Sequence, residues 1–181
     1  MSPVAKGLKR FGTGYDESRL DFIAQPQPPN TKIMEKITRS ADANWKGNLD
    51  EGHGLVSLQS RAFTEERFSF AKRIDQEQSE TNPEELIAGA AASCFGMALS
   101  KTLQDDGQAS EKLRVKADVT LGITDDGPKV TDLKLAVEAI LPEYDEDQLE
   151  AAVKKTAENC PIFQLLKPGF ESVAIESSLQ R

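Results

Sequence analysis

The sequence of 181 residues carries 30 acidic and 22 basic side chains, for a formal net charge of −8. That balance argues against a nucleic-acid backbone or an anionic membrane surface as the main partner, because both attract basic proteins. We find no run of about 20 apolar residues that would cross a membrane, and no apolar stretch of the kind that marks a secretory signal near the start. We therefore expect a cytoplasmic protein without nucleic-acid or membrane partners, whose thiols stay reduced unless they are used.

The first 30 residues differ from the rest in composition. They contain several glycines and prolines and show no hydrophobic period, which predicts an irregular extension over residues 1–30 and a folded domain over residues 31–181. Two roles fit such an extension: a tail without function, or an arm that clasps a partner subunit through its aromatic and aliphatic side chains.

Segments typical of β-strands come next. Residues 32–45 and 54–60 predict two strands joined by a turn-rich loop over residues 46–53, and residues 67–71 predict a third strand. The single histidine, His53, falls in that polar loop, so we expect it to be exposed to solvent. One histidine and two cysteines cannot build a usual four-ligand zinc site without carboxylates, and we expect neither a metal nor a cofactor.

A long helix follows the third strand. Asn82 is a natural N-cap, Pro83 suits the first helical position, and Glu85 is placed to complete a capping box. Residues 86–99 are apolar nearly all round and rich in alanine and glycine. This composition predicts burial on most sides and a close approach by another backbone. The helix fades out at the Asp-Asp-Gly sequence of residues 105–107.

Two strictly alternating segments follow the helix. Residues 113–123 and 133–139 alternate between apolar and polar side chains, and a turn at residues 125–128 separates them. They predict two half-buried strands that pair as an antiparallel hairpin.

The last part of the chain predicts a second helix and a final strand. The helix begins near Asp145 and stops at Pro161, which cannot continue the helical hydrogen bonding. Residues 162–166 predict one further turn, and residues 173–175 mark the strand. The element order is β-β-β-α-β-β-α-β, so we predict an α+β fold with two long helices and antiparallel sheets.

The chain has two cysteines, and each falls on the buried face of a predicted helix. Cys94 lies in the long apolar helix, and Cys160 closes the second helix just before Pro161. Thiols in a core are most often inert packing groups. A pair of them also suits a nucleophilic thiol with a resolving partner, which is redox chemistry.

Three segments around these cysteines resemble the OsmC/Ohr family of thiol-dependent hydroperoxide reductases, and details of them look closer to the OsmC branch. They are Asn-Pro-Glu-Glu-Leu-Ile at residues 82–87, Cys-Phe-Gly-Met-Ala-Leu-Ser at 94–100 and Asn-Cys-Pro-Ile at 159–162. The resemblance implies an OsmC-like fold, an intertwined homodimer and the reduction of organic hydroperoxides to alcohols. It also implies that no cofactor is bound and that an external dithiol or lipoyl-type reductant resets the thiols.

The resemblance also assigns the site residues. Carried over by motif, they are a peroxidatic Cys94, a resolving Cys160, Arg73 and Glu84. Arg67 is the alternate for the arginine, because the loop of residues 73–81 differs in length from the OsmC pattern.

The spacing of Glu84 and Cys94 bears on the assembly. Ten residues on one helix separate two side chains by about 15 Å along the axis, so the two cannot touch within one subunit. If two copies of the helix crossed antiparallel near Gly89, Glu84 of one copy would come level with Cys94 of the other. The alternative is a helix buried in its own subunit, with Glu84 as a first-turn partner of the helix dipole.

Three classes of function stay open on the sequence. The leading one is an organic hydroperoxide reductase. The second is a non-enzymatic OsmC-like stress or binding scaffold with structural cysteines. The third is a thiol redox sensor that relays oxidation to a partner docked on the extension.

Overall fold

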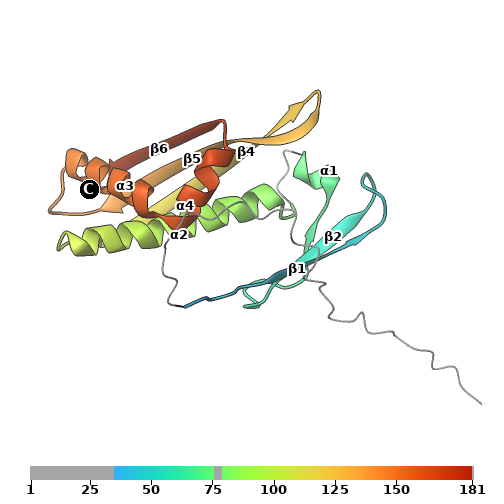
Figure 1. Cartoon of the computed structure of the whole chain (residues 1–181), viewed down its shortest axis with the longest axis horizontal. Helices are drawn as coiled ribbons and strands as arrows, with labels where there is room; N and C mark the ends of the chain where they lie inside the picture. Colours follow the sequence, from blue (N-terminus) through green and yellow to red (C-terminus); the bar gives the residue numbers. More distant parts are fainter. Residues whose placement is uncertain (1–34, 76–78, 181) are drawn as a thin grey trace, which may run out of the picture. The chain divides into compact units, whose positions relative to one another are not determined.

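A computed structural model describes residues 35–75 and 79–180 of the chain (Figure 1). The described residues from Arg39 onward belong to one compact unit. The predicted extension of residues 1–30, its boundary and the start of the first predicted strand lie outside the described residues. Residues 35–40 are not part of a strand, so the first strand is shorter than the predicted range of residues 32–45.

The first sheet has three antiparallel strands in the order β1-β2-β3. They are β1 (Ala41–Lys46), β2 (His53–Leu58) and β3 (Glu66–Phe68). The rings of Trp45 and Phe68 lie 5.7 Å apart, centroid to centroid, across Gly54 of the central strand. A Cβ at that glycine would come within 2.2 Å of the Phe68 ring, so this close packing requires a residue without a side chain.

Two local predictions for this region are wrong. His53 starts β2 opposite Lys46 and is half-buried, because the strand ladder extends one residue into the predicted loop. The third strand ends at Phe68, and the following residues form the single helical turn α1 (Phe70–Arg73). Ser69 explains the change, since its side chain accepts a hydrogen bond from the backbone N–H of Lys72 at 3.3 Å and so caps a helix.

The long helix is α2 (Pro83–Asp105) and begins at the predicted N-cap. The side chain of Asn82 accepts a hydrogen bond from the backbone N–H of Glu85 at 2.8 Å. The carboxylate of Glu85 accepts a hydrogen bond from the Thr81 hydroxyl at 2.9 Å, which takes the place of the predicted capping box. A complete capping box forms instead at the start of the second helix, between Asp145 and Gln148.

Only one face of α2 is buried within the chain, which corrects the prediction of burial on most sides. Ala91, Phe95 and Leu99 face the core, whereas Met97 is 69% exposed on the opposite side. Among the described residues, α2 is the one helix long and apolar enough to span a membrane, a criterion that the core helix of a soluble protein also meets. The sequence shows no uninterrupted apolar run of this length, because polar residues interrupt the helix.

The second sheet has the order β4-β5-β6. Strands β4 (Lys112–Thr124) and β5 (Gly127–Ile140) form the predicted antiparallel hairpin. Strand β6 (Ser172–Leu179) pairs with β5 in the parallel direction, so the prediction of antiparallel sheets is wrong for this pair.

The parallel pairing follows from the segment between the two strands. It consists of the helices α3 (Glu146–Asn159) and α4 (Pro161–Leu166) and the 3₁₀ turn η2 (Lys167–Gly169). A helical crossover of this length returns the chain to the end of the sheet from which β5 started, which a tight turn cannot do.

The core lies between this second sheet and the helices α2 and α3 (Figure 1). Every second residue of β5 from Leu133 to Ala139 is buried, as expected for a strand with one covered face. The arrangement confirms the predicted α+β class and brings α3 and α4 against α2. Both cysteines lie at that contact.

Candidate active site

The two cysteine thiols meet at the contact of α2 with the junction of α3 and α4. The Sγ atoms of Cys160 and Cys94 lie 3.4 Å apart, and both thiols are free. A disulfide bond is about 2.05 Å long, so the pair is in contact but not bonded. The structure therefore brings together two residues that lie 66 positions apart in the sequence.

The junction that holds Cys160 depends on Pro161. Cys160 leaves the helical region with φ −72° and ψ 115°, and Pro161 begins α4. Because proline has no N–H, the carbonyl of Ala157 loses the donor that a continuous helix would supply. The side-chain amide of Gln164 replaces it and donates to that carbonyl at 2.6 Å. The side chain of Gln164 thus satisfies the carbonyl that the helix break leaves without a donor. The thiol of Cys160 is directed inward.

The two thiols differ in their access to solvent. Cys160 is fully buried, whereas Cys94 is half-buried. Burial raises the pKa of the Cys160 thiol, because a charged thiolate is poorly solvated in the core. Cys160 therefore remains a neutral thiol at neutral pH, and a molecule from solvent reaches Cys94 more readily.

Two aromatic rings form the apolar surroundings of the thiol pair. Phe95, next to Cys94, and Phe163, three residues after Cys160, pack edge to face with centroids 5.8 Å apart. Both side chains are buried. The thiols thus lie beside hydrophobic side chains of the two helices that carry them.

The predicted arginine and glutamate form a bidentate ion pair. Arg73 of α1 donates from Nε to Oε2 of Glu84 at 3.0 Å and from Nη2 to Oε1 at 2.5 Å. The alternate residue, Arg67, contacts a different carboxylate: its Nε lies 2.7 Å from Oε1 of Glu80. The Ser69 hydroxyl donates to the second oxygen of Glu80 at 2.7 Å. The geometry therefore pairs Arg73, and not Arg67, with Glu84.

The ionisation of this pair follows from its surroundings. Burial raises the pKa of the Glu84 carboxyl, but hydrogen bonds from Arg73 and from a backbone N–H outweigh burial and hold that pKa below its ordinary value. The hydrogen bond with Glu84 raises the pKa of Arg73. Both groups are charged at neutral pH, and a bidentate carboxylate fixes the plane of the guanidinium.

A pH dependence of stability follows for Glu84. A carboxyl with a lowered pKa in the folded state contributes stability above its unfolded pKa of about 4.3, and the contribution is lost as the pH falls through the folded value. We expect Glu84→Gln to lower the free energy of unfolding at pH 7 by roughly 1–2 kcal/mol. The difference from wild type should shrink below about pH 4. Urea unfolding at pH 7, 5 and 3 measures it, and a constant difference would contradict the assignment.

Within one chain the two halves of the site stay apart. Cys94 lies ten residues after Glu84 on α2, which corresponds to about 15 Å along the helix axis. The structure therefore joins Cys94 with Cys160 and Arg73 with Glu84, but it does not join one pair with the other. No group of three or more potential metal ligands lies together within residues 35–75 and 79–180.

Sequence reasoning missed some of the residues that support these pairs. Gln164 closes the helix break beside Cys160, and Glu80 links Arg67 to the cap of α1. Pro161 was a usable signal for Gln164, because a proline inside a helical segment requires another donor for the freed carbonyl. Glu80 lies in a loop and gave no comparable signal.

The fold and the paired thiols define an α+β protein of the OsmC-like class, and the comparisons with known proteins agree. Residues 76–172 match the family of OsmC-like proteins. The chain is also 35% identical to Peroxiredoxin OsmC of Escherichia coli over 131 residues, which cover 72% of this chain and 91% of that protein. The chain therefore belongs to the OsmC-like family. The matched segment of residues 76–172 includes Glu84, Cys94 and Cys160 and begins three residues after Arg73.

Solved structures show the same fold. An organic hydroperoxide resistance protein OsmC of Legionella pneumophila is 24% identical with a TM-score of 0.57, and the match covers 81% of this chain and 100% of that one. An organic hydroperoxide resistance protein of Elizabethkingia anophelis is 19% identical with a TM-score of 0.64, over 81% and 100% of the two chains. At these identities the likeness concerns the fold.

Proposed function

We propose that this protein is a thiol-dependent peroxidase that reduces organic hydroperoxides to alcohols. The observation that carries the proposal is the contact of the Cys94 and Cys160 sulfur atoms at 3.4 Å. Two free thiols at this distance can form a disulfide after a small movement. The similarity to a protein named a peroxiredoxin supports the same chemistry.

The proposed cycle has three steps. The Cys94 thiolate attacks one oxygen of the hydroperoxide ROOH, the O–O bond breaks, and the alkoxide takes up a proton and leaves as ROH. Cys94 becomes a sulfenic acid. The Cys160 thiol then attacks that sulfur, which forms the disulfide and releases water. An external dithiol, such as a lipoyl-type group, reduces the disulfide by exchange and is itself oxidised.

The burial of the two thiols supports this division of roles. A peroxide must reach the nucleophile from solvent, and Cys94 is the more accessible thiol. Cys160 is fully buried, and burial raises its pKa. It is therefore protected from direct attack by peroxide and is positioned to react with the sulfur of Cys94.

The apolar surroundings favour an organic substrate. Cys94 packs against the apolar cluster that includes Cys160, Phe95 and Phe163, and an alkyl or aryl group gains free energy when it leaves water for such apolar surroundings. Hydrogen peroxide offers no such group.

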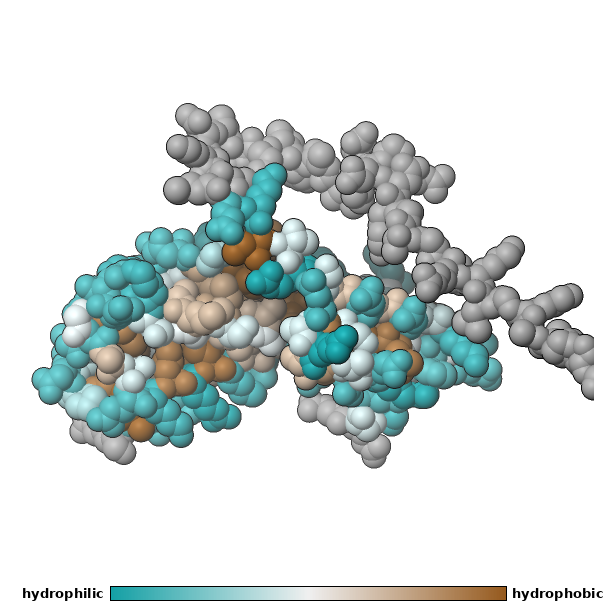
Figure 2. Space-filling model, turned by 90° about the horizontal axis from the view of Figure 1, so that it is seen from below, coloured by the Kyte–Doolittle hydropathy of each residue, from teal (hydrophilic) through white to brown (hydrophobic). Residues whose placement is uncertain are grey.

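Arg73 and Glu84 enter this proposal through a homodimer. The exposed face of α2 includes Gly89, Ser93 and Met97, and a Cβ at Gly89 would meet open space beyond its own helix. Apolar side chains reach the surface on the side of the molecule where α2 lies (Figure 2). A second copy that crosses this face about a two-fold axis buries it and brings its Arg73–Glu84 pair level with Cys94. The guanidinium then stabilises the thiolate and the departing oxygen.

The first test compares two peroxides on the wild-type protein. With excess dithiothreitol, we expect cumene hydroperoxide to be consumed at least about tenfold faster than hydrogen peroxide, because the apolar site stabilises its aryl group. The protein with both thiols alkylated is the control. Equal, negligible rates with both peroxides would contradict the peroxidase function and leave a binding scaffold as the better account. Equal and fast rates would contradict the organic preference alone.

A further inference from the structure

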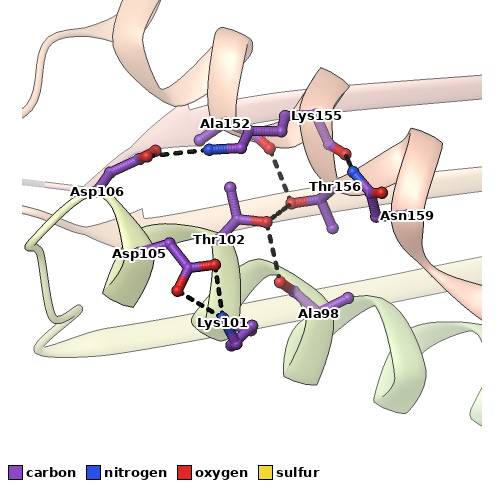
Figure 3. Close-up of polar contacts among 9 residues, drawn as sticks. All are labelled: Ala98, Lys101, Thr102, Asp105, Asp106, Ala152, Lys155, Thr156 and Asn159. Carbon is purple, nitrogen blue, oxygen red and sulfur yellow. Dashed lines mark hydrogen bonds and ion pairs between the residues drawn. The ribbon is translucent and has the colours of Figure 1, made fainter.

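A buried pair of hydroxyl groups joins the two helices that carry the cysteines (Figure 3). Thr156 of α3 and Thr102 of α2 are 0% and 7% exposed. The Thr156 hydroxyl lies 3.0 Å from the Thr102 hydroxyl, which in turn donates to the carbonyl of Ala98 at 3.1 Å. Two hydroxyl groups are thus bonded to each other in the buried part of the helix contact.

The hydrogen bonds of this pair form a directed chain. Thr156 Oγ1 also lies 2.8 Å from the carbonyl oxygen of Ala152. A hydroxyl has one proton, so Thr156 donates either to Ala152 or to Thr102. When it donates to Thr102, the chain runs from Thr156 through Thr102 to Ala98 and crosses from one helix to the other.

The pair lies about one helical turn from Cys160 and about two turns from Cys94 along the helices. The N–H of Cys160 donates to the carbonyl of Thr156 at 2.9 Å, so this threonine is in the turn that ends at the resolving cysteine. Thr102 follows Cys94 by eight residues on α2, or about 12 Å along the axis. Because helices are stiff over this length, a slide between α2 and α3 at the threonines changes the distance between the sulfur atoms.

The rest of the interface between α2 and α3 fixes the relative position of the two helices less tightly than the hydroxyl pair does. Apolar side chains such as Leu103, Leu149 and Val153 pack there, and the hydrophobic effect that holds them together is not directional, whereas a hydrogen bond is. At the exposed end of the interface, Lys155 Nζ lies 3.0 Å from Asp106 Oδ1 (Figure 3). An exposed ion pair between flexible side chains constrains geometry weakly.

We infer that the Thr102–Thr156 hydroxyl pair positions the two cysteines for disulfide formation. It fixes the axial position of α3 against α2 and so keeps the two sulfur atoms in contact. The catalytic meaning of this inference rests on the proposed peroxidase function, in which the Cys160 thiol attacks the Cys94 sulfenic acid to give the disulfide and water. A poorly aligned Cys160 gives a second hydroperoxide time to oxidise Cys94 to the sulfinic acid.

The test replaces either threonine with a residue of the same shape. Thr156→Val and Thr102→Val remove one hydroxyl each, whereas Thr156→Ser keeps the hydroxyl and removes the methyl group. The first measurement is the ratio of disulfide to dithiol in glutathione redox buffers, which reports the effective concentration of one thiol at the other without any peroxide. We expect both valine variants to lower it by up to about tenfold, the scale of one hydrogen bond, and the serine variant to retain it.

The second measurement follows the protein after peroxide is added. The rate of sulfenic acid formation at Cys94 should be unchanged in the valine variants, whereas the share of sulfinic acid, read by mass spectrometry, should rise. Two controls are matched to the change: Lys155→Gln breaks the exposed link at the same interface, and Thr120→Val makes the same exchange on the exposed side of β4. Neither should alter the glutathione equilibrium.

The outcomes separate this inference from the proposed function. If the valine variants lose thermal stability but keep the wild-type glutathione equilibrium, the hydroxyl pair is structural only and the inference is wrong. If Thr156→Val does not fold, Thr102→Val decides, since Thr156 can still donate to Ala152. If the wild type consumes no peroxide, the proposed function fails, and the glutathione equilibrium still tests the alignment of the thiols.

Discussion

Replacing Cys94 with serine is expected to lower peroxidase turnover by roughly three orders of magnitude or more, the scale on which loss of a catalytic nucleophile acts. The serine hydroxyl keeps the shape of the side chain but is not ionised at neutral pH, so it cannot attack the peroxide. The half-buried Cys94 is the accessible thiol of a pair in contact at 3.4 Å. Turnover of cumene hydroperoxide with excess dithiothreitol measures the effect.

The matched variant is Cys160→Ser, which should separate the two steps. Cys94 still attacks, so one equivalent of peroxide is consumed rapidly, but no disulfide can form. The sulfenic acid should then persist and react with dimedone. In the wild-type protein the disulfide forms first and prevents this reaction. If Cys160→Ser and Cys94→Ser lose the first equivalent of peroxide consumption equally, the assignment of the two roles is wrong.

The second large effect concerns Arg73. Arg73→Met should slow the reaction of Cys94 with peroxide by about a hundredfold, comparable to the loss of one positioned charge or donor at a reacting oxygen. Methionine keeps much of the length of the side chain while it removes the guanidinium that Glu84 holds in two hydrogen bonds. Arg67→Met is the matched control, because Arg67 contacts Glu80 instead, and we expect it to retain most of the activity.

Mixed dimers test where Arg73 acts. When Cys94→Ser and Arg73→Met chains are refolded together, a site shared between subunits leaves one intact site in each mixed dimer. Since half of randomly formed dimers are mixed, the mixture should recover about a quarter of the wild-type activity. A site contained within one chain recovers none. No recovery, despite mixed dimers isolated by two affinity tags, would contradict the shared site.

Several parts of this protein could be predicted because they depend on neighbours in the sequence. The hairpin of β4 and β5 follows from strict alternation over residues 113–123 and 133–139, and each strand pairs with the next segment of the chain. The start of α2 follows from Asn82 and Pro83, whose capping geometry involves only the first turn. The order of strands and helices, and with it the α+β class, follows from the same local patterns.

Other features depended on contacts between distant segments, and local sequence patterns do not predict such contacts. The strand expected through Ala71 became a helical turn, because Ser69 caps α1 while it also donates to Glu80 eleven residues later. The exposed face of α2 was expected to be buried, because an apolar composition does not say whether its own chain or a second copy covers it.

Local hydrogen bonding, capping and the alternation of side chains were enough to predict most of the strands and helices, including the long helix that carries Cys94 and the helix that Cys160 ends. The four candidate site residues did not follow from these patterns and came from the resemblance to the OsmC/Ohr family. Three features became known only from the folded chain: the two sulfur atoms meet at 3.4 Å, Arg73 rather than Arg67 binds Glu84, and β6 runs parallel to β5. These features arise from the packing of segments far apart in the chain, where a shift of a few ångströms between elements makes or breaks a contact without any change in local pattern.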